Sequence, residues 1–414
     1  MKHALLALGL ALAATTASAE TTLRVHYAIP TIWADTQDAL AEAFMEAHPD
    51  VTVSLDGPAE GYSDGVQRLL RESVAGTAPD VAWVGLNLWR VLEARDLAQP
   101  LDPFLPEDPE AAGYTGALLS LGQFDDQQYA LGTSASTLVM YVNPDLVERA
   151  GGSMADFPTD FDGIIDLAAQ IDALDSTTEG VWIAPHDWRF QSLLGAHGGR
   201  PMTADETDIT FDDDAGIAAA SLYGRFASEA GMSSMSENDA RQAFPAGTLG
   251  IMFESSSLMT RFSEGADGRF DVTVKPMPIV AADDEVYLPT GGSGIVMLTD
   301  DAETQQAAWD YISFVTSPEA QKIIVETTGY APTNALVVED ESYLGGFYEA
   351  NPNARVAHEQ VARYAGPWYA YPGTEGVAVT DLIAADLLEI IEGADPRDTI
   401  EALADTVRGM LRFD

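Results

Sequence analysis

Cysteine is absent from this chain of 414 residues. The absence excludes disulfides, thiol nucleophiles and metal sites built from thiolates. It also excludes a lipid anchor attached through a cysteine at the N-terminus of the mature protein. The fold must therefore depend on packed hydrophobic cores, and 46% hydrophobic residues with 9% aromatics are enough to build them.

Basic residues are scarce, because 20 Lys and Arg stand against 66 Asp and Glu, which gives a formal net charge of −46. A surface this acidic repels nucleic acid and anionic lipid, so we expect no nucleic-acid partner. Adaptation to a saline habitat is the favoured explanation, because dissolved salt weakens the self-repulsion. A cationic ligand is the less favoured explanation, since charge spread over the whole chain says little about one pocket.

Long apolar runs are absent after residue 19. At the N-terminus Lys2 and His3 precede an apolar run over residues 4–14, and Ala17-Ser18-Ala19 follows. This pattern is typical of a secretory signal peptide that is cleaved after Ala19. The run is shorter than the roughly 20 residues that span a bilayer. We therefore expect an exported protein that is free in a bacterial periplasm.

The first part of the mature chain alternates between strand and helix patterns. Such alternation predicts an α/β fold with a parallel sheet. The mature chain is also too long for one ordinary core, which predicts two domains or lobes. Strands are expected at residues 23–27, 51–55 and 80–84, with amphipathic helices at residues 36–47 and 66–75.

Helix signals continue to the C-terminus. Thr159, with Asp162 three residues later, resembles a capping box that starts a helix. Ser317 followed by Pro318 begins another helix in the usual order of cap and then proline. Two final helices are expected at about residues 377–392 and 396–412.

Four motifs occur along the chain in a definite order. They are AGTAPDVAWVG at residues 75–85, YALGTSASTLVMYVNPDLVERAG at 129–151, GTLGIMFESSS at 247–257, and the segment from GGSGIVML to TTGYAPT at 291–333. The last motif is the most specific, with AAWDYISFVTSPEAQ at its centre. Together the motifs resemble the family 1 extracellular solute-binding proteins, which are the periplasmic receptors of ABC importers for sugars, polyols and glycerol-3-phosphate.

The resemblance implies a two-lobed α/β fold of the periplasmic-binding-protein type, with crossing hinge segments and a ligand cleft between the lobes. It places residues 20–133 and 289–328 in an N-terminal lobe, and residues 134–288 and 329–414 in a C-terminal lobe. It further implies a monomer that closes around a small polar solute and delivers it to the transmembrane subunits of an ABC permease. A carbohydrate or polyol is the favoured solute, and glycerol-3-phosphate or a related phosphodiester is the alternative.

The resemblance also implies polar residues that contact the solute, and the turn Gly291-Gly292-Ser293 could expose backbone N–H groups to a ligand oxygen. They follow strands or lie in the expected crossing segments, where side-chain and backbone N–H groups can reach ligand oxygens. Each has an ordinary structural alternative, namely an exposed loop residue, a helix cap, a turn serine or a hinge glycine. The candidates of this kind are Tyr62, Asn87, Ser134, Ser136, Ser255, Ser256, Gly291, Gly292 and Ser293.

Aromatic residues form the second set of candidates. Tyr330 and Trp188 match aromatic positions of the family. The segment GPWYAYPG adds Trp368, Tyr369 and Tyr371. Aromatic faces stack on the apolar faces of sugar rings, and phenol and indole groups supply hydrogen bonds. The glycerol-3-phosphate receptors carry an arginine in about this region, so the aromatic cluster favours a neutral, ring-bearing sugar.

A secreted carbohydrate-active enzyme is the alternative from another class. Its catalytic carboxylates would lie roughly 5–9 Å apart, a distance that sequence does not give. No H-E-x-x-H, G-x-S-x-G or P-loop motif occurs, and residues 212–214 lack the spacing of a calcium loop. A structural or hydrogen-bonding role explains His186 beside Asp187 better than catalysis does. We expect no catalytic residue, no metal and no cofactor.

Overall fold

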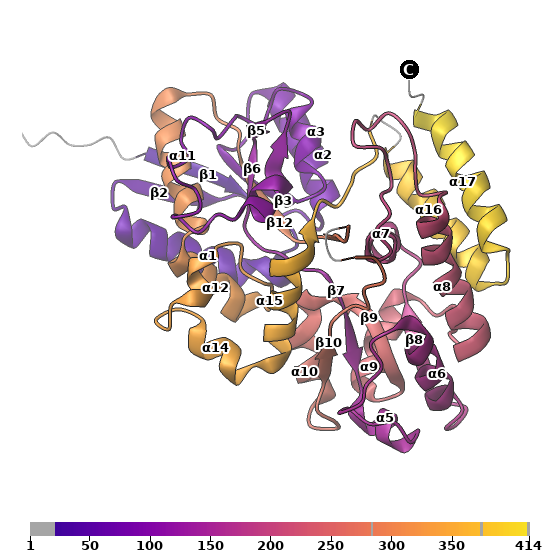
Figure 1. The fold of residues 1–414 in the computed structure, drawn as a ribbon. Coiled ribbons are helices and arrows are strands. Elements are labelled where there is room, and N and C mark those ends of the chain that lie inside the picture. Colours follow the sequence, from indigo (N-terminus) through magenta and orange to yellow (C-terminus); the bar gives the residue numbers. More distant parts are fainter. Residues whose placement is uncertain (1–20, 283–284, 373–375, 412–414) are drawn as a thin grey trace, which may run out of the picture.

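The computed structural model describes residues 21–282, 285–372 and 376–411 (Figure 1). The expected signal peptide, residues 1–19, therefore lies outside the described residues. Within the described part, two larger β-sheets stand apart, and each is packed by its own helices (Figure 1). No helix of this part is long and apolar enough to cross a membrane.

The first sheet has five strands, in the order β2 (Val51–Leu55), β1 (Thr21–His26), β3 (Val81–Gly85), β12 (Ser293–Met297) and β6 (Ala130–Gly132). β1 pairs in parallel with β2 and β3, as the alternating pattern predicts. β12 returns from a distant part of the chain and pairs antiparallel with both β3 and β6. The sheet is therefore mixed, and the prediction of a parallel sheet is right only for its first three strands.

Helices cover both faces of this sheet. They are α1 (Pro30–Ala47), α2 (Tyr62–Ala75), α3 (Trp89–Glu93), α11 (Ala302–Val315) and α12 (Pro318–Thr328). Val81 and Trp83 of β3 join a hydrophobic cluster with α1, α11 and α12. Ala82 and Val84 point the other way and join a cluster with α2 and α3. A strand covered on both faces is apolar throughout, which explains the unbroken run VAWV.

The second sheet has four strands, in the order β10 (Thr273–Lys275), β7 (Leu138–Val142), β9 (Leu249–Ser255) and β8 (Glu179–Ile183). Only β8 and β9 are parallel, and the other two pairs are antiparallel. Near the C-terminus α16 and α17 pack against α8 (Figure 1). The helices of this part are α5 (Pro144–Arg149), α6 (Phe161–Asp172), α7 (Asp187–Ala196), α8 (Asp214–Ala230), α9 (Glu237–Ala246), α10 (Met259–Ala266), α15 (Pro352–Tyr364), α16 (Gly376–Ile391) and α17 (Pro396–Leu411).

Side-chain caps start several of these helices. Asp160, not Thr159, caps α6 by accepting a hydrogen bond from the backbone N–H of Gly163, so the predicted start was one residue early. Asp213 caps α8, and its neighbour Asp212 pairs with Arg408. Ser317 caps α12 ahead of Pro318, in the predicted order. Helix N-termini favour such oxygens because their first N–H groups lack partners within the helix.

The remaining elements are short. α4 (Gly116–Leu119) and the 3-10 turn η1 (Ser120–Gly122) lead into a hairpin of β4 (Gln123–Phe124) and β5 (Gln127–Gln128). The 3-10 turn η2 (Ser256–Leu258) follows β9, and α13 (Leu336–Glu339) and α14 (Gly345–Ala350) follow α12. β11 (Leu288–Pro289) pairs in parallel with β13 (Ala365–Gly366).

Three segments of the chain meet side by side between the two sheets. The segment from β6 to β7 passes from the first sheet to the second, and the segment from β11 to β12 leads back to the first. Ser136 and Gly291 exchange backbone hydrogen bonds of 2.9 and 2.8 Å. Ala135 exchanges another pair, of 3.0 and 2.8 Å, with Ala331, which follows α12. We call these segments, residues 133–137, 289–293 and 329–333, the crossing segments.

Gly292 has a backbone that requires glycine at the closest approach of two crossing segments. Its φ is +123°, and a Cβ atom there would lie 2.2 Å from the carbonyl oxygen of Ser134. Glycine alone tolerates both the left-handed backbone and the close approach. The lobe boundaries at residues 133/134, 288/289 and 328/329 stay a prediction.

Candidate functional site

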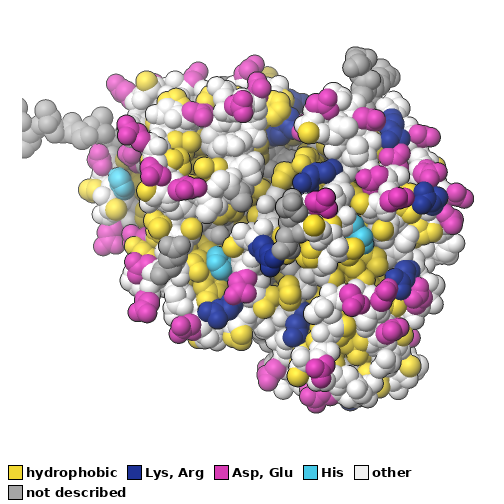
Figure 2. All heavy atoms as spheres, viewed as in Figure 1, with side chains coloured by type: hydrophobic (Ala, Val, Ile, Leu, Met, Phe, Trp, Pro, Cys, Tyr) yellow, Lys and Arg dark blue, Asp and Glu magenta, His cyan; other side chains and the backbone are white. Residues whose placement is uncertain are grey.

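A cavity of about 1010 Å³ opens beside the crossing segments. Its wall combines α1 and the end of α12 from the first sheet with α7, α9 and α10 from the second. In the view of Figure 2, acidic side chains are spread over the outer parts of the face, whereas several Lys and Arg side chains lie nearer its middle. The volume is at the upper end of the range for small-molecule sites.

Seven of the predicted site residues line this cavity. They come from all three crossing segments, from α7, from the end of β9 and from the loop after β13. The sequence motifs therefore converge in space although they are spread over more than half of the chain. The seven residues are Ser136, Trp188, Ser255, Gly291, Gly292, Tyr330 and Trp368.

Two tryptophans form the aromatic part of the wall. The rings of Trp188 and Trp368 lie 6.3 Å apart, with 57° between their planes. The Nε1–H of Trp188 donates to the carbonyl oxygen of Pro289 at 2.9 Å, and that of Trp368 donates to Asp187 Oδ2 at 3.0 Å. Both indole groups are thus held by hydrogen bonds on their polar side, which leaves ring surface to the cavity.

Tyr330 stands at the side of the first sheet. Its ring stacks on Trp33 with centroids 5.3 Å apart and 18° between the planes. Only 7% of Tyr330 is exposed. Burial raises the pKa of its phenol, so the group is a neutral hydrogen-bonding partner.

Asn87 and Tyr369 lie beside the main cavity in a pocket of about 170 Å³, to which Trp368 also contributes. α3 is capped by Leu88 without a side-chain hydrogen bond, so Asn87 does not serve as the helix cap considered from the sequence. Tyr369 packs edge-on against Tyr287, with ring centroids 5.8 Å apart. Trp368 therefore separates two neighbouring compartments.

The other predicted residues are not among those that line the cavity. Ser134 and Ser293 are fully buried and hydrogen-bond each other at 3.1 Å. The Tyr62 hydroxyl accepts a hydrogen bond of 2.9 Å from Trp33. Their polar groups are thus used within the protein. Ser256 and Tyr371 are also buried, and the Ser256 hydroxyl has no partner among the described residues.

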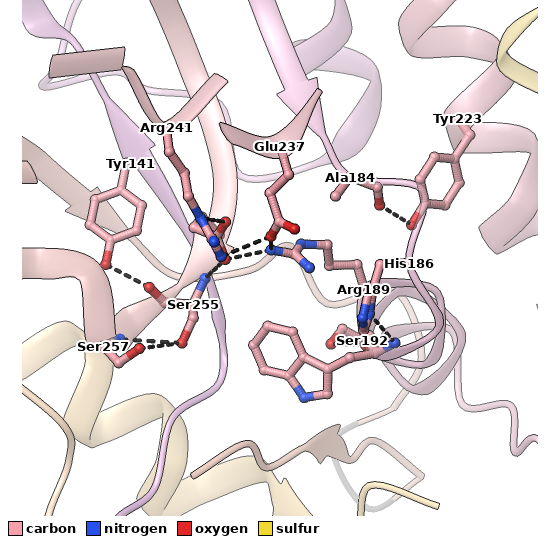
Figure 3. A network of polar contacts seen from close by, with 12 residues as sticks. Tyr141, Ala184, His186, Arg189, Ser192, Tyr223, Glu237, Arg241, Ser255 and Ser257 are labelled. Atoms are coloured by element: carbon pink, nitrogen blue, oxygen red, sulfur yellow. Dashed lines mark hydrogen bonds and ion pairs between the residues drawn. The ribbon is translucent and has the colours of Figure 1, made fainter. Parts of the chain in front are cut away.

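A group of four charged side chains, three of which line the cavity, was not among the predicted site residues; Figure 3 labels Arg189, Arg241 and Glu237. Glu254 of β9 accepts from Arg189 Nη2 at 2.6 Å and from Arg241 Nε at 3.0 Å. Glu237 pairs with the same two arginines, at 2.8 Å from Arg241 Nη2. We call Arg189, Arg241, Glu237 and Glu254 the charge cluster. Two positive and two negative groups make it neutral.

Burial and charge compete in this cluster. Burial opposes ionisation of Glu254, but Arg189 and Arg241 outweigh it and hold the pKa of Glu254 below its usual value. Burial likewise opposes the charge on Arg189, yet Glu254 and Glu237 keep its pKa raised. His186 is adjacent, and burial, followed by the charge of Arg189, lowers its pKa to about 4. At neutral pH the cluster is therefore ionised and His186 is uncharged.

Asp187 supports the aromatic wall from behind. It accepts hydrogen bonds from Trp368 and, at 3.0 and 3.1 Å, from the Gln191 amide. The Tyr371 hydroxyl lies 3.5 Å from its Oδ1. Burial raises the pKa of Asp187 to about 6, and these donors limit the increase. Asp187 thus positions the side chains of Trp368 and Tyr371. Among the described residues, no group of three or more side chains that could hold a metal ion is found.

Comparison with known proteins identifies the family. A family model described as bacterial extracellular solute-binding protein matches residues 39–355. The chain belongs to this family. A sequence relative is the sn-glycerol-3-phosphate-binding periplasmic protein UgpB of Escherichia coli O1:K1, with 25% identity over 384 residues, covering 86% of this chain and 84% of UgpB.

Solved structures show the same fold. UgpB from Mycobacterium tuberculosis in complex with glycerophosphocholine has a TM-score of 0.81 and 22% identity, covering 94% of this solute-binding protein and 98% of that chain. The sugar-binding protein MalE from Xanthomonas citri also has a TM-score of 0.81, with 16% identity and coverage of 95% and 98%.

Family and fold together confirm three predictions made from the sequence. This solute-binding protein has the two-lobed α/β fold of periplasmic binding proteins. It is a solute-binding receptor of the kind that serves ABC importers. The relatives named above are binding proteins, which removes the alternative of a secreted carbohydrate-active enzyme.

Proposed function

We propose that this receptor captures a neutral sugar in the periplasm and passes it to the transmembrane subunits of an ABC importer. The observation that carries the proposal is the cavity wall in which Trp188 and Trp368 stand beside Ser136, Ser255 and a neutral charge cluster. Aromatic faces suit the apolar faces of a sugar ring. Hydroxyl and backbone groups suit its oxygens.

The mechanism follows from where the wall residues come from. Thr31 and Ile32 of α1 lie on one side of the cavity, and Trp188 and Ser255 lie on the other. A solute that touches both sides stabilises the closed arrangement over the open one, and closure needs no covalent step. We propose that the lobes are residues 20–133 with 289–328 and residues 134–288 with 329–414, that they rotate about the crossing segments, and that the receptor acts as a monomer.

A phosphodiester of glycerol is the second candidate. Arg241 and Arg261 both line the cavity, and guanidinium groups are the usual partners of phosphate. The name of the Escherichia coli relative, which binds sn-glycerol-3-phosphate, points the same way. Arg241 is already paired with Glu237 and Glu254, which lowers its value as a phosphate ligand.

A thermal-shift screen followed by calorimetry tests the proposal. The purified mature protein is heated with neutral mono- and oligosaccharides, polyols, glycerol-3-phosphate and glycerophosphocholine. A ligand at 100 times its dissociation constant stabilises the fold by about 2.7 kcal/mol, which is a readable shift. We expect the largest shift from a neutral sugar. If only the phosphate esters stabilise the protein, the second candidate replaces the first.

A further inference from the structure

The charge cluster at the cavity points to a residue that sets ligand specificity. We infer that Glu254 excludes anionic solutes, because it cancels the positive charge of the two arginines that reach the cavity wall. This inference rests on the proposed function as a receptor for neutral sugars. Glu254 would act by electrostatics on its neighbours, without itself contacting the solute.

The contacts of Glu254 explain why it is not a solute ligand. Oε1 accepts from Arg189 at 2.6 Å and from the backbone N–H of Ser255 at 2.7 Å, and Oε2 accepts from Arg241 at 3.0 Å. The side chain is fully buried. Its oxygens are therefore directed at protein donors, and its main effect on the cavity is through charge.

Arg189 and Glu254 are sequence neighbours of two residues proposed to hold the sugar. Arg189 follows Trp188 on α7, and Glu254 precedes Ser255 at the end of β9. Trp188, Arg189, Glu254 and Ser255 all line the same cavity, and Figure 3 labels Arg189 and Ser255 among them. A change of charge at Glu254 would thus act beside Ser255 and, through Arg189, beside Trp188, where burial weakens screening by solvent.

The other charges on the wall do not alter the balance. Among the described residues that line the cavity, Arg261 and Glu264 are the remaining charged groups, one of each sign. His186 is uncharged at neutral pH. The wall is therefore close to neutral as a whole. Loss of the Glu254 charge would leave Arg189 and Arg241 sharing Glu237, with one positive charge in excess.

An anion would benefit from that excess charge. Hydrogen bonds from a guanidinium to a phosphate are charge-assisted and are about twice as strong as neutral ones. In the natural protein both arginines direct such bonds at Glu254. Glu254→Gln keeps the size of the side chain and removes only its charge, so it should convert a neutral wall into an anion-attracting one.

The experiment compares four proteins by calorimetry: the natural receptor, Glu254→Gln, Glu237→Gln and the double variant Glu254→Gln/Arg241→Gln. The probes are glycerol-3-phosphate and the neutral sugar that gives the largest thermal shift. We expect glycerol-3-phosphate to bind Glu254→Gln at least tenfold more tightly than the natural receptor. The gain should decrease at high salt, and the double variant, whose charge is balanced again, should lose it.

Glu237→Gln keeps the inference testable if Glu254→Gln does not fold. Glu237 is about one-third exposed, so its loss disturbs packing less while removing the same charge. We expect a smaller gain for glycerol-3-phosphate in the same direction. Folding of each variant is checked by circular dichroism and by its melting temperature.

The outcomes separate the two proposals. If no neutral sugar binds the natural receptor, the proposed function fails and the inference fails with it. If a neutral sugar binds but neither folded charge variant gains affinity for glycerol-3-phosphate, only the inference is overturned. Tight binding of glycerol-3-phosphate by the natural receptor, with Glu254 in place, would also overturn it.

Discussion

Arg90 and Glu206 join the two halves of the receptor beside the smaller pocket that Asn87 and Tyr369 line. Arg90 Nη1 donates to Glu206 Oε1 at 2.6 Å, across 116 residues of sequence. Arg90 belongs to α3 on the first sheet, and Glu206 lies in the loop between α7 and α8 on the second. The guanidinium also stacks over Phe124, 3.9 Å from its ring centre. Glu206 has a φ of +54°, an uncommon conformation for this residue type.

Arg90→Ala should shift the receptor toward a more open form and weaken ligand binding. Both side chains are about a quarter to a third exposed, so the pair contributes only about 0.2–1 kcal/mol, which is at most roughly a fivefold loss of affinity. Small-angle scattering and calorimetry measure the two effects. Arg149→Ala is the matched control, because Arg149 pairs with Asp175 at 3.2 Å on a single side of the molecule. Equal behaviour of the two variants would contradict a link between the halves.

Trp368→Ala should abolish most of the thermal shift produced by the sugar, because the ring stands between both compartments of the cleft. The unliganded protein should lose about 1–2 kcal/mol as well, since the buried Asp187 loses a hydrogen-bond donor. Trp368→Phe should retain part of the binding. Trp309→Ala is the control, because Trp309 stacks on Phe104 away from the cavity. Normal sugar binding by Trp368→Ala would refute the role of this ring.

Asp187→Asn should change how stability depends on pH. The pKa of Asp187 is about 6 in the folded protein, compared with 3.8 for an unperturbed aspartate, so the unfolded chain releases the proton first as pH rises. Stability from this group therefore falls between about pH 4 and 6, by roughly 3 kcal/mol at most. In Asp187→Asn this group no longer titrates. The free energy of unfolding of the variant, relative to that of the natural protein, should therefore increase as pH rises from about 4 to 6. Urea unfolding from pH 4 to 7 measures the difference, and parallel curves would contradict it.

His186→Gln should have the opposite effect. The pKa of His186 is about 4 when folded against 6.5 unfolded, so the unfolded chain takes up the proton first as pH falls. This group thus makes stability rise with pH between about 4 and 6.5. In His186→Gln the free energy of unfolding should increase less steeply with pH over this range, and urea unfolding from pH 4 to 7 measures the slope. An unchanged slope would show that His186 titrates normally in the folded protein.

Gly292→Ala should destabilise the receptor by about 2 kcal/mol or more. The new Cβ would combine an unfavourable φ of +123° with a contact of 2.2 Å to the Ser134 carbonyl oxygen. Gly393→Ala separates the two causes, because Gly393 has a φ of +110° but no described atom would lie within 4 Å of its added Cβ. Chemical denaturation should show a larger loss for Gly292→Ala. Equal losses would mean that the contact relaxes at little cost.

Processing at the N-terminus can be tested directly. We expect intact-mass analysis of periplasmic extract to give a chain that begins at Glu20, because Ala17 and Ala19 present small side chains at the cleavage positions. A chain that retains Met1, or that occurs only in the cytoplasm, would disprove export by this route.

Sequence patterns predicted the strands of the first sheet well and their directions less well. The run of Val81 to Val84 predicts a strand buried on both faces, and β3 occupies that place. The antiparallel direction of β12 depends on how the chain returns from the second sheet, which periodicity does not contain. The alternation rule is local, whereas strand direction is set by tertiary connections.

At the site, too, local sequence patterns predicted some residues correctly, whereas others depend on tertiary contacts that the sequence does not show. Trp188 was expected at the ligand from its match to a family position, and Trp368 from the density of aromatic residues in its segment. Both line the cavity. Tyr371 was expected there too, but it turns inward to Asp187, three residues after Trp368. Glu254 was missed because its partners lie 65 and 13 residues away, so no local pattern reveals the ion pairs. A charged residue inside the apolar strand GIMFES was the available signal.

The paired backbone bonds between Ser136 and Gly291, and between Ala135 and Ala331, tie the crossing segments into one narrow ribbon. If the two halves rotate about the crossing segments as proposed, this ribbon is the part of the receptor that moves least. Ser136 and Gly291 line the cavity beside this ribbon, whereas Arg90 and Glu206 line the neighbouring smaller pocket. Under the proposed rotation, a displacement of a fraction of an ångström beside the ribbon would become a larger movement at Arg90 and Glu206, which lie farther from it.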